Sequence, residues 1–354
     1  MDKDVLSRIP KNREIYILID CGAFLVSYLR YRLVTWNKAN ITPFIKILDV
    51  FMRLSLQNPK AKFLFFIDNG VSEKLKSLYG AYKSNRRHSI KRRSDRFIAA
   101  DPTKSNDYVI NRTLLCKFFI NLGHAVFYYS EADYQLGYAL NKLKKKYEKD
   151  SNDIYVLSHD NDLMSLIEYS NCIHKVAKNK ANKDNYKLYK LYDVGDYESY
   201  VQNMRVGTYE EYIIMKSLSG DDVDNIMKPI MIDDRFVKAL FNKYKYDFGY
   251  ATLDSEKTFE IIRNKVLKKV KDSTEYGNIE ERLAYEFRRN YLIFDIYNSE
   301  PLFANDELRY INTTLDALMN NKITKNLEES RQTLRRVSQT YLALFDKWIM
   351  ATKY

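Results

Sequence analysis

The sequence predicts an α/β fold: a mostly parallel central sheet with helices on both faces, followed by a mainly helical C-terminal region. Short apolar runs alternate with longer helical segments up to about residue 195, which is typical of parallel strands buried on both faces. Beyond Asp193 helical segments predominate and strand-like runs are few. The 354 residues are enough for about two domains. We expect these domains to be residues 1–195 and 196–354.

The first strand is expected at 15–19, a run rich in β-branched residues, and a helix follows it with Leu25, Leu29 and Leu33 on one face. Further apolar runs predict strands at 63–67, 126–129 and 154–157 and helices around 114–122 and 136–147. The lysine-rich stretch 175–190 has the pattern of a hairpin. In the C-terminal region, helices are expected at 209–218, 234–244, 256–270 and 315–350.

The composition limits the class of protein. An apolar content of 45% is ordinary for a globular chain and argues against wholesale disorder. The 58 Lys and Arg exceed the 46 Asp and Glu by a net charge of +12, which fits either simple solubility or a polyanionic partner such as nucleic acid. No run approaches the ~18 apolar residues of a membrane span, and the N-terminus lacks the apolar core of a secretory signal. We therefore expect a cytoplasmic protein with no membrane partner.

The cysteines and histidines argue against soft-metal chemistry. The 3 cysteines are widely spaced and the 4 histidines form no ligand pattern, so neither a disulfide framework nor a thiolate zinc site is indicated. Any bound metal should therefore be a hard cation held by oxygen atoms.

Acidic residues follow four of the predicted strands. Ligands bind beyond the carboxyl ends of parallel strands, so we expect these acids to converge at one edge of the sheet. Divalent cations would keep so many neighbouring carboxylates ionised, and oxygen-only ligands favour Mg²⁺ or Mn²⁺. One such Asp alone would be an ordinary turn residue. The residues are Asp20, Asp68, Glu131, Asp133, Asp160 and Asp162.

Several motifs carry a resemblance to a known family. They are Asp20 after a strand, Phe66-Ile-Asp68, Tyr79-Gly-Ala-Tyr-Lys83 with Arg86, Glu131-Ala-Asp133, Ser158-His-Asp-Asn-Asp162 and Gly220-Asp-Asp-Val-Asp-Asn225. In order and approximate spacing, the sequence resembles the 5′-nuclease superfamily over about residues 14–226. That superfamily holds the flap endonucleases, the 5′ nuclease domains of bacterial DNA polymerase I and the bacteriophage 5′→3′ exonucleases called ribonuclease H.

The resemblance implies a PIN-like nuclease core and a site for two Mg²⁺ ions, with Mn²⁺ as a substitute. By resemblance, the first metal would lie nearer the early acids, and the second nearer Asp160, Asp162 and Asp221. In this scheme the helical region completes the metal site at 220–225. The implied metal-binding residues are Asp20, Asp68, Glu131, Asp133, Asp160, Asp162 and Asp221, with Asp224 in an outer position.

The resemblance also implies a basic gateway segment at 80–100. Lys83 and Arg86, from its Tyr-Lys-x-x-Arg motif, would contact the scissile phosphate, and such cations can neutralise charge that develops during phosphoryl transfer. The residues that follow are candidates for nucleic-acid contacts, although a solvated basic face would have the same composition. They are Arg87, Lys91, Arg92 and Arg93.

The chain departs from the family pattern in three places. Tyr134 replaces a further acid, Cys21 replaces the glycine after the first Asp, and 226–235 lacks the glycines of a helix-hairpin-helix motif. The cation site of that motif should therefore be absent, as in the phage ribonuclease H branch, whose late segment resembles Asn290–Asp295. Duplex contacts would instead come from side chains, with a steep salt dependence. The candidates are Lys228, Arg235 and Lys238.

The activity implied by the resemblance is metal-dependent 5′→3′ exonuclease or flap endonuclease cleavage at the 5′ ends of DNA or RNA–DNA duplexes. Primer or flap removal in phage replication would be the role, and a monomer is expected. A non-catalytic nucleic-acid-binding homologue and a PIN-type ribonuclease of single-stranded RNA remain alternatives. Retention of all the acids argues against the first, and the motif at 220–225 argues against the second.

The C-terminal stretch allows two interpretations. Gln339 to Phe345 has the spacing of peptides that dock on a sliding clamp, and a clamp or single-strand-binding protein would suit a replication enzyme. Leu342, Phe345 and Ile349 also form a helical stripe of the kind that packs into a core.

Overall fold

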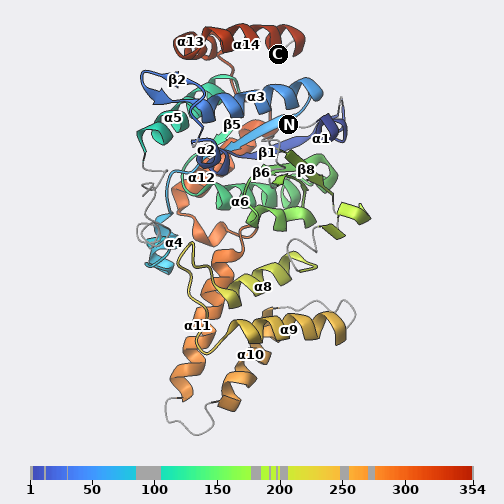
Figure 1. The fold of residues 1–354 in the computed structure, drawn as a ribbon, viewed down its shortest axis with the longest axis vertical. Helices are drawn as coiled ribbons and strands as arrows, with labels where there is room; N and C mark the ends of the chain where they lie inside the picture. The colour runs from blue at the N-terminus through green and yellow to red at the C-terminus, as the bar shows by residue number, and fades with distance from the viewer. Residues whose placement is uncertain are drawn as a thin grey trace. The chain divides into compact units, whose positions relative to one another are not determined.

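The computed structural model describes residues 3–11, 13–29, 31–84, 105–176, 185–190, 193–196, 198–199, 206–247, 255–269 and 276–352. The chain forms two compact units (Figure 1). The first, here called the sheet unit, comprises Met1–Val71, Ala99–Glu198 and Ala304–Tyr354. The second, the helical unit, comprises Ser72–Ile98 and Ser199–Phe303. One division between the units thus lies between Glu198 and Ser199, close to the boundary that the sequence predicts, whereas 72–98 groups with the helical unit and 304–354 with the sheet unit.

A six-stranded sheet forms the centre of the sheet unit, in the order β5-β4-β1-β6-β7-β8. All neighbouring pairs are parallel except β7 and β8, which form the antiparallel hairpin expected in the lysine-rich stretch. This sheet confirms the predicted fold class. The strands are β1 (Tyr16–Asp20), β4 (Lys62–Phe66), β5 (Ala125–Phe127), β6 (Ile154–Ser158), β7 (Asn171–Val176) and β8 (Asn185–Tyr189). A separate two-stranded ribbon pairs β2 (Thr35–Trp36) with β3 (Ala39–Asn40).

Helices cover both faces of this sheet (Figure 1). Ile17 and Ile19 of β1 join one core with Phe44, Phe51 and Phe118, which come from α3 and α5. On the other face, α6 contacts β1 and β4, and α12 contacts β5. The helices of this unit are α1 (Lys3–Ser7), α2 (Cys21–Leu29), α3 (Thr42–Gln57), α5 (Asn106–Asn121), α6 (Ala132–Lys145), α12 (Asn305–Met319), α13 (Leu327–Val337) and α14 (Gln339–Thr352).

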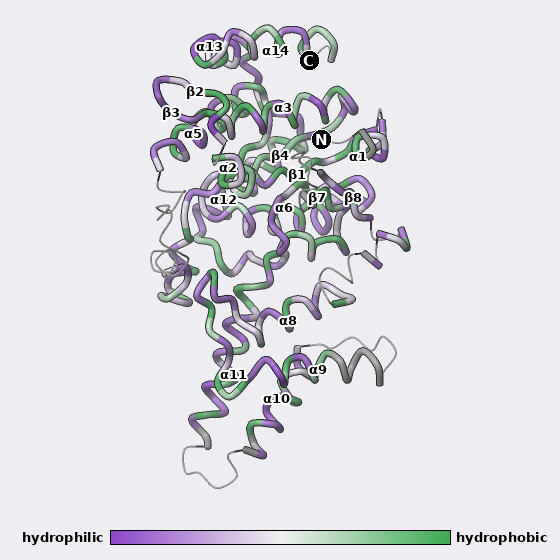
Figure 2. Tube along the Cα trace, in the orientation of Figure 1, coloured by the Kyte–Doolittle hydropathy of each residue, from purple (hydrophilic) through white to green (hydrophobic). Residues whose placement is uncertain are grey.

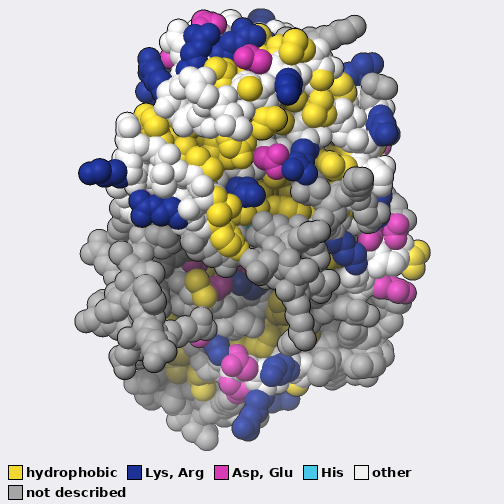
Figure 3. Space-filling model, turned by 45° about the horizontal axis from the view of Figure 1, so that its top comes forward, with side chains coloured by type: hydrophobic (Ala, Val, Ile, Leu, Met, Phe, Trp, Pro, Cys, Tyr) yellow, Lys and Arg dark blue, Asp and Glu magenta, His cyan; other side chains and the backbone are white. Residues whose placement is uncertain are grey.

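The central strands β1, β4 and β6 are mostly hydrophobic because both of their faces are covered. All residues of β1 and β6 are buried. Figure 2 shows hydrophobic colouring in the middle of β1 and β4, whereas hydrophilic and hydrophobic residues alternate along α11. Lys and Arg side chains are interspersed with hydrophobic and a few acidic ones on the face that carries α13 and α14 (Figure 3).

The C-terminal helices belong to the core of the sheet unit. Phe345 of α14 is 0% exposed and its ring lies 5.4 Å from that of Phe118. Trp348 is 3% exposed, and its Nε1 donates to Ser55 Oγ at 2.7 Å. The stripe on α14 is thus a packing stripe. The helix predicted at 315–350 is three helices, α12 to α14.

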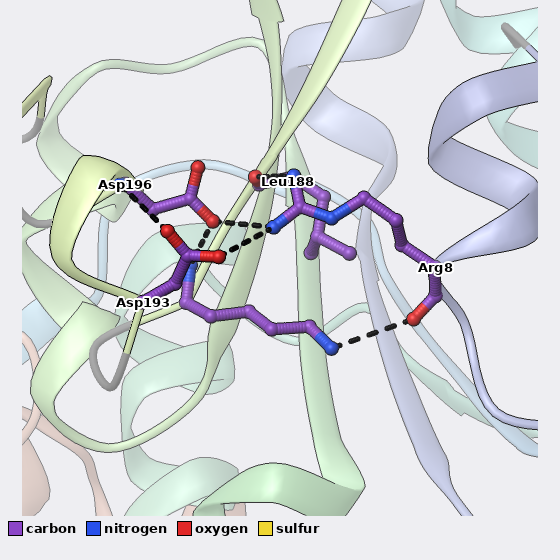
Figure 4. Close-up of polar contacts among 5 residues, drawn as sticks. Arg8, Leu188, Asp193 and Asp196 are labelled. Atoms are coloured by element: carbon purple, nitrogen blue, oxygen red, sulfur yellow. Dashed lines mark hydrogen bonds and ion pairs between the residues drawn. The ribbon is translucent and has the colours of Figure 1, made fainter.

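A partly buried polar cluster joins the end of the N-terminal helix to the edge of the sheet. The Arg8 guanidinium donates to the Leu188 carbonyl oxygen at 3.0 Å and to Asp196 Oδ2 at 2.5 Å, and it lies 3.6 Å from Asp193 Oδ2 (Figure 4). Lys190 Nζ donates in return to the Arg8 carbonyl oxygen at 3.4 Å. Arg8 thereby provides a hydrogen-bond donor for a backbone carbonyl near the end of β8, the antiparallel edge strand.

The helical unit has a core of its own. Ile214 and Leu218 pack with Leu240, Ile262 and Phe287, which come from three further helices. The Ser72 hydroxyl caps α4 and donates to the Leu302 carbonyl oxygen at 2.7 Å. The helices are α4 (Glu73–Leu78), α8 (Tyr209–Ser219), α9 (Asp234–Asp247), α10 (Ser255–Lys269) and α11 (Tyr276–Phe294). No helix in the described part of the chain is both long and apolar enough to span a membrane.

Candidate active site

Asp20 occupies the point where β1 ends and α2 begins. Its side chain is 1% exposed. One carboxylate oxygen accepts from the Ala23 backbone N–H at 3.1 Å, and the other accepts from the Ser158 hydroxyl at 2.5 Å. The start of α2 and the end of β6 therefore fix the orientation of this buried carboxylate.

The parallel register brings the other strand ends to the same edge. Asp20 pairs with Phe66 of β4, and Phe66 pairs with Phe127 of β5. Asp68 follows β4, and its Oδ1 accepts from the Ala132 N–H at 2.7 Å, at the start of α6. Two more predicted acids lie at that helix start, Glu131 as its N-cap and Asp133 in its first turn.

Gly22 gives the clearest evidence that two of these acids converge. A Cβ atom at Gly22 would lie 2.1 Å from Asp68 Oδ2 and 3.4 Å from Asp20 Oδ1. Both carboxylates therefore face the space over the first turn of α2. The motifs do not single out Gly22; the available signal was a glycine two residues after an acid, at the start of a helix.

The end of β6 adds the third group of acids. The Ser158 hydroxyl oxygen, which donates to Asp20, accepts from the Asp160 N–H at 2.8 Å. Asp160 Oδ1 in turn accepts from the Asp162 N–H at 2.9 Å. A chain of hydrogen bonds thus connects the acid at the end of β1 to the two that follow β6.

The electrostatics of Asp20 reflect this convergence. Burial, followed by the negative charge of Asp68, raises the pKa of Asp20 to about 7, against the lowering effect of the hydrogen bonds from Ser158 and Ala23. Asp160 raises the pKa further, by a smaller amount. Carboxylates that follow the two neighbouring strands, β4 and β6, therefore act on this one buried group.

These oxygen donors fit a hard divalent cation. No group of three or more Asp, Glu, His or Cys side chains within the described ranges is already gathered at metal-binding geometry. Asp20 and Asp68 nevertheless face a common space, and their mutual repulsion is what a cation placed there would relieve. Carboxylate oxygens are the ligands that Mg²⁺ and Mn²⁺ prefer.

The loop 220–226 of the helical unit carries the remaining predicted acids. Asp221 and Ile226 form a backbone bridge with two hydrogen bonds of 2.8 Å. Gly220 has φ +67° at the start of this loop, and a Cβ there would lie 2.4 Å from the Ile226 carbonyl oxygen. A glycine is therefore needed for the chain to close the loop.

Asp221 has a cation partner within the same unit. Lys216 Nζ lies 2.7 Å from Asp221 Oδ2, and the Val223 N–H donates to Oδ1 at 2.8 Å. Burial raises the pKa of Asp221, but the Lys216 ammonium and the backbone N–H groups outweigh it and leave the pKa below its usual value. The carboxylate is thus held ionised by a lysine that the motifs did not indicate.

Lys83, the predicted phosphate-contacting residue, adjoins the same loop. Its backbone N–H donates to the Asp224 carbonyl oxygen at 2.8 Å, and its Nζ lies 3.8 Å from Asp224 Oδ2. The Tyr82 hydroxyl also donates to Asp224 Oδ2, at 3.4 Å. The structure therefore brings together two residues that lie far apart in the sequence and that the resemblance assigns to one site.

The other predicted basic residues either lie on the surface of the helical unit or fall outside the described ranges. Lys228, Arg235 and Lys238 are exposed in the helical unit, and Lys228 Nζ lies 2.5 Å from Asp234 Oδ1. Of the predicted metal-binding acids, Asp221 and Asp224 belong to the helical unit and the others to the sheet unit. The residues that lie outside the described ranges are Arg86, Arg87, Lys91, Arg92 and Arg93.

Comparisons with known proteins find structural similarity only. No family model matches the sequence, and no curated protein matches it. The bacteriophage T5 5′-exonuclease with bound zinc aligns with a TM-score of 0.54 and 16% identity over 86% of this chain and 100% of that chain. A T5 protein co-crystallised with metal ions aligns with a TM-score of 0.52 and 16% identity over 92% of this chain and 100% of that chain.

A third structure is a variant of the bacteriophage T5 flap endonuclease, in a pseudo-enzyme–product complex with DNA and metal ions. It gives a TM-score of 0.50 and 17% identity over 92% of this chain and 100% of that chain. The chain therefore has the fold of a 5′-exonuclease. The resemblance inferred from the motifs is confirmed at the level of the fold.

Proposed function

We propose that this chain, with the fold of a phage 5′-exonuclease, is a metal-dependent 5′ nuclease that hydrolyses phosphodiesters at the 5′ ends of DNA or RNA–DNA duplexes. One observation carries the proposal. Asp20 is buried at the carboxyl edge of the sheet, faces Asp68 over Gly22, and has a pKa raised by its burial and by the charges of Asp68 and Asp160. Repulsion between buried carboxylates does not stabilise a fold, whereas close carboxylates are what a cation-binding site requires.

The chain supplies oxygen ligands for two Mg²⁺ ions, with Mn²⁺ as a substitute. When bound, divalent cations lower the pKa of water and stabilise the leaving 3′ oxygen. Ser158 and the Ala23 N–H orient Asp20 for such binding, and the Ala132 N–H orients Asp68. The proposed ligands are Asp20, Asp68, Glu131, Asp133, Asp160, Asp162 and Asp221, with Asp224 in an outer position.

Lys83 contacts the scissile phosphate in this proposal, together with Arg86. An ammonium group at that position stabilises the negative charge that develops on the phosphate oxygens. Lys228, Arg235 and Lys238 contact the duplex backbone from the exposed surface of the helical unit, as do Arg87, Lys91, Arg92 and Arg93 of the gateway segment. Each phosphate contact steepens the salt dependence of binding.

The biological role that we propose is removal of primers or 5′ flaps in phage replication, by a monomer in the host cytoplasm. The products carry a 5′ phosphate and a 3′ hydroxyl. Docking on a sliding clamp through 339–345 is not part of the proposal, because Phe345 is 0% exposed in the core of the sheet unit. The alternative of a non-catalytic homologue makes a distinct prediction for the following experiment.

The test is digestion of 5′-labelled flap, nicked and RNA–DNA substrates with and without Mg²⁺. We expect Mg²⁺-dependent cleavage by the wild type, and a loss of at least about 100-fold in Asp160→Asn with DNA affinity within about threefold. Asp49→Asn is the matched control, since Asp49 is a surface carboxylate that pairs with Arg53 on α3.

Wild-type turnover by Asp160→Asn in Mg²⁺ would overturn the assignment of the metal site. DNA binding without cleavage under any divalent cation would favour the non-catalytic homologue. Cleavage restricted to single-stranded RNA would favour a PIN-type ribonuclease.

A further inference from the structure

We propose that Asn225 is a positioning residue that holds Lys83 in place for phosphate contact; this inference rests on the proposed function. Asn225 Nδ2 donates to the Ala81 carbonyl oxygen at 2.8 Å and to the Ser84 hydroxyl at 3.0 Å. These two contacts lie on either side of Lys83. The Asn225 amide thus spans the backbone turn from which the Lys83 side chain projects.

The backbone at this contact is strained on both sides. Lys83 has φ +55° and Asn225 has φ +57°, in the left-handed region that residues other than glycine seldom adopt. Asparagine tolerates this conformation better than lysine does. A strained residue persists only where its surroundings hold it, and such residues cluster at functional sites. The contacts that hold the backbone around Lys83 include the Asn225 amide, which bonds to the residues on either side, and the Asp224 carbonyl oxygen, which accepts from the Lys83 N–H.

The loop that carries Asn225 is itself held in place by several contacts. The Asp221–Ile226 bridge closes it, and Asn290, which is 0% exposed, donates to the Met227 carbonyl oxygen at 2.8 Å. The Arg289 guanidinium stacks on the Tyr79 ring at 4.1 Å, and the Tyr79 hydroxyl accepts from the Met227 N–H at 3.4 Å. The segment around Lys83 is therefore anchored to α11 and to the loop at several points.

Asn225 acts on the backbone of the Lys83 segment and leaves the Lys83 charge untouched. Its removal should therefore misplace the ammonium group while the overall charge that attracts DNA stays the same. A misplacement of about 1 Å at a reacting centre lowers rates by up to about 100-fold. The effect should appear in the chemical step and hardly at all in affinity.

The first test compares single-turnover cleavage and DNA affinity in three variants. Asn225→Gly removes both hydrogen bonds and still permits the left-handed backbone. Asn225→Asp keeps the shape of the side chain and loses the Nδ2 donor. Both should cleave about 10- to 100-fold more slowly, and Asn225→Gly, which leaves the charge unchanged, should bind DNA with Kd within about threefold of the wild type. Val223→Ala, at a residue of the same loop that is 70% exposed, should match the wild type.

The second test is a double-mutant cycle with Lys83→Ala. If Asn225 acts through Lys83, adding Asn225→Gly to Lys83→Ala should slow cleavage by less than about twofold more. An equal loss in both backgrounds would overturn the inference, because Asn225 would then act independently of Lys83. A wild-type rate in Asn225→Gly or Asn225→Asp would overturn it as well.

The third test does not depend on cleavage. Hydrogen exchange of the Lys83 amide should be about tenfold faster in Asn225→Gly than in the wild type, with an unchanged melting temperature. Unchanged exchange would overturn the positioning role even for an active nuclease. If the wild type cleaves no substrate while exchange accelerates as expected, the proposed function fails and the structural contact stands, so the two failures are distinguishable.

Discussion

The folded protein favours the protonated form of the buried Asp20 carboxyl group. Its pKa is about 7 in the folded protein, raised by burial and by Asp68, against an ordinary value of 3.8. Between these two values the folded state binds more protons than the unfolded state. Without a cation, stability is therefore highest below pH 4 with respect to this group and is lost as the pH rises through 7. A bound divalent cation would stabilise the ionised Asp20 and so offset this loss of stability.

Asp20→Asn should accordingly stabilise the metal-free protein. We expect the free energy of unfolding at pH 8 in EDTA to rise by about 2–4 kcal/mol, and the difference from the wild type to vanish near pH 4. Mg²⁺ or Mn²⁺ should raise the melting temperature of the wild type and leave that of the variant unchanged. Urea denaturation at pH 4, 6 and 8 measures the first effect. A variant less stable than the wild type at pH 8 would contradict this electrostatic account.

At the scale of elements, the site depends on how α2 begins. The helix starts directly after β1 without a connecting loop, so its first turn lies over the carboxyl edge of the sheet. Only a residue without a side chain leaves room there for the carboxylates of Asp20 and Asp68. The first turn of α2 is thus part of the site although it supplies no charged group after Asp20.

Gly22→Ala should separate metal binding from stability. The added methyl group would displace the end of the flexible Asp68 side chain, so we expect the Kd for Mg²⁺ or Mn²⁺ to rise by about 10- to 100-fold. Metal-free stability should change by less than about 1 kcal/mol, because alanine favours a helix over glycine. Calorimetry and thermal denaturation measure the two effects. Val26→Ala, at a position of α2 that is 39% exposed, is the control for altered helix packing.

An unchanged metal affinity in Gly22→Ala would place the cation away from Asp68. A large loss of stability without metal would show instead that the first turn of α2 cannot accept a side chain for reasons of packing.

At the scale of the whole molecule, patterns repeated along the chain were predictable and contacts between distant segments were not. The buried strands and the acids at their ends follow from local hydropathy and from the geometry of parallel sheets. Leu33, expected on the face of the helix after β1, is 70% exposed because that helix ends at Leu29. The side chain of Asn40 accounts for this end, since it donates to the carbonyl oxygens of Leu29 and Tyr31.

The same difference between local patterns and distant contacts decides which parts of the candidate site could be predicted. The acids at the strand ends could be predicted because each follows an apolar run. The roles of Gly22 and Asn225 could not, since they depend on contacts with residues more than forty positions away in the sequence. The membership of α14 in the sheet unit depends likewise on Ser55 and Phe118.

Trp348→Ala tests whether the C-terminal helix is part of the sheet unit's core. Trp348 is 3% exposed, its ring lies 5.3 Å from that of Phe51, and its Nε1 donates to Ser55. Its removal leaves a cavity and takes away the hydrogen bond that the indole N–H donates to Ser55, so we expect a loss of about 3–5 kcal/mol in the free energy of unfolding. Met350→Ala, at a position of the same helix that is 73% exposed, should change stability by less than about 0.5 kcal/mol. Equal stability of the two variants would mean that α14 is dispensable to the fold, and that 339–345 is free to bind a partner such as a sliding clamp.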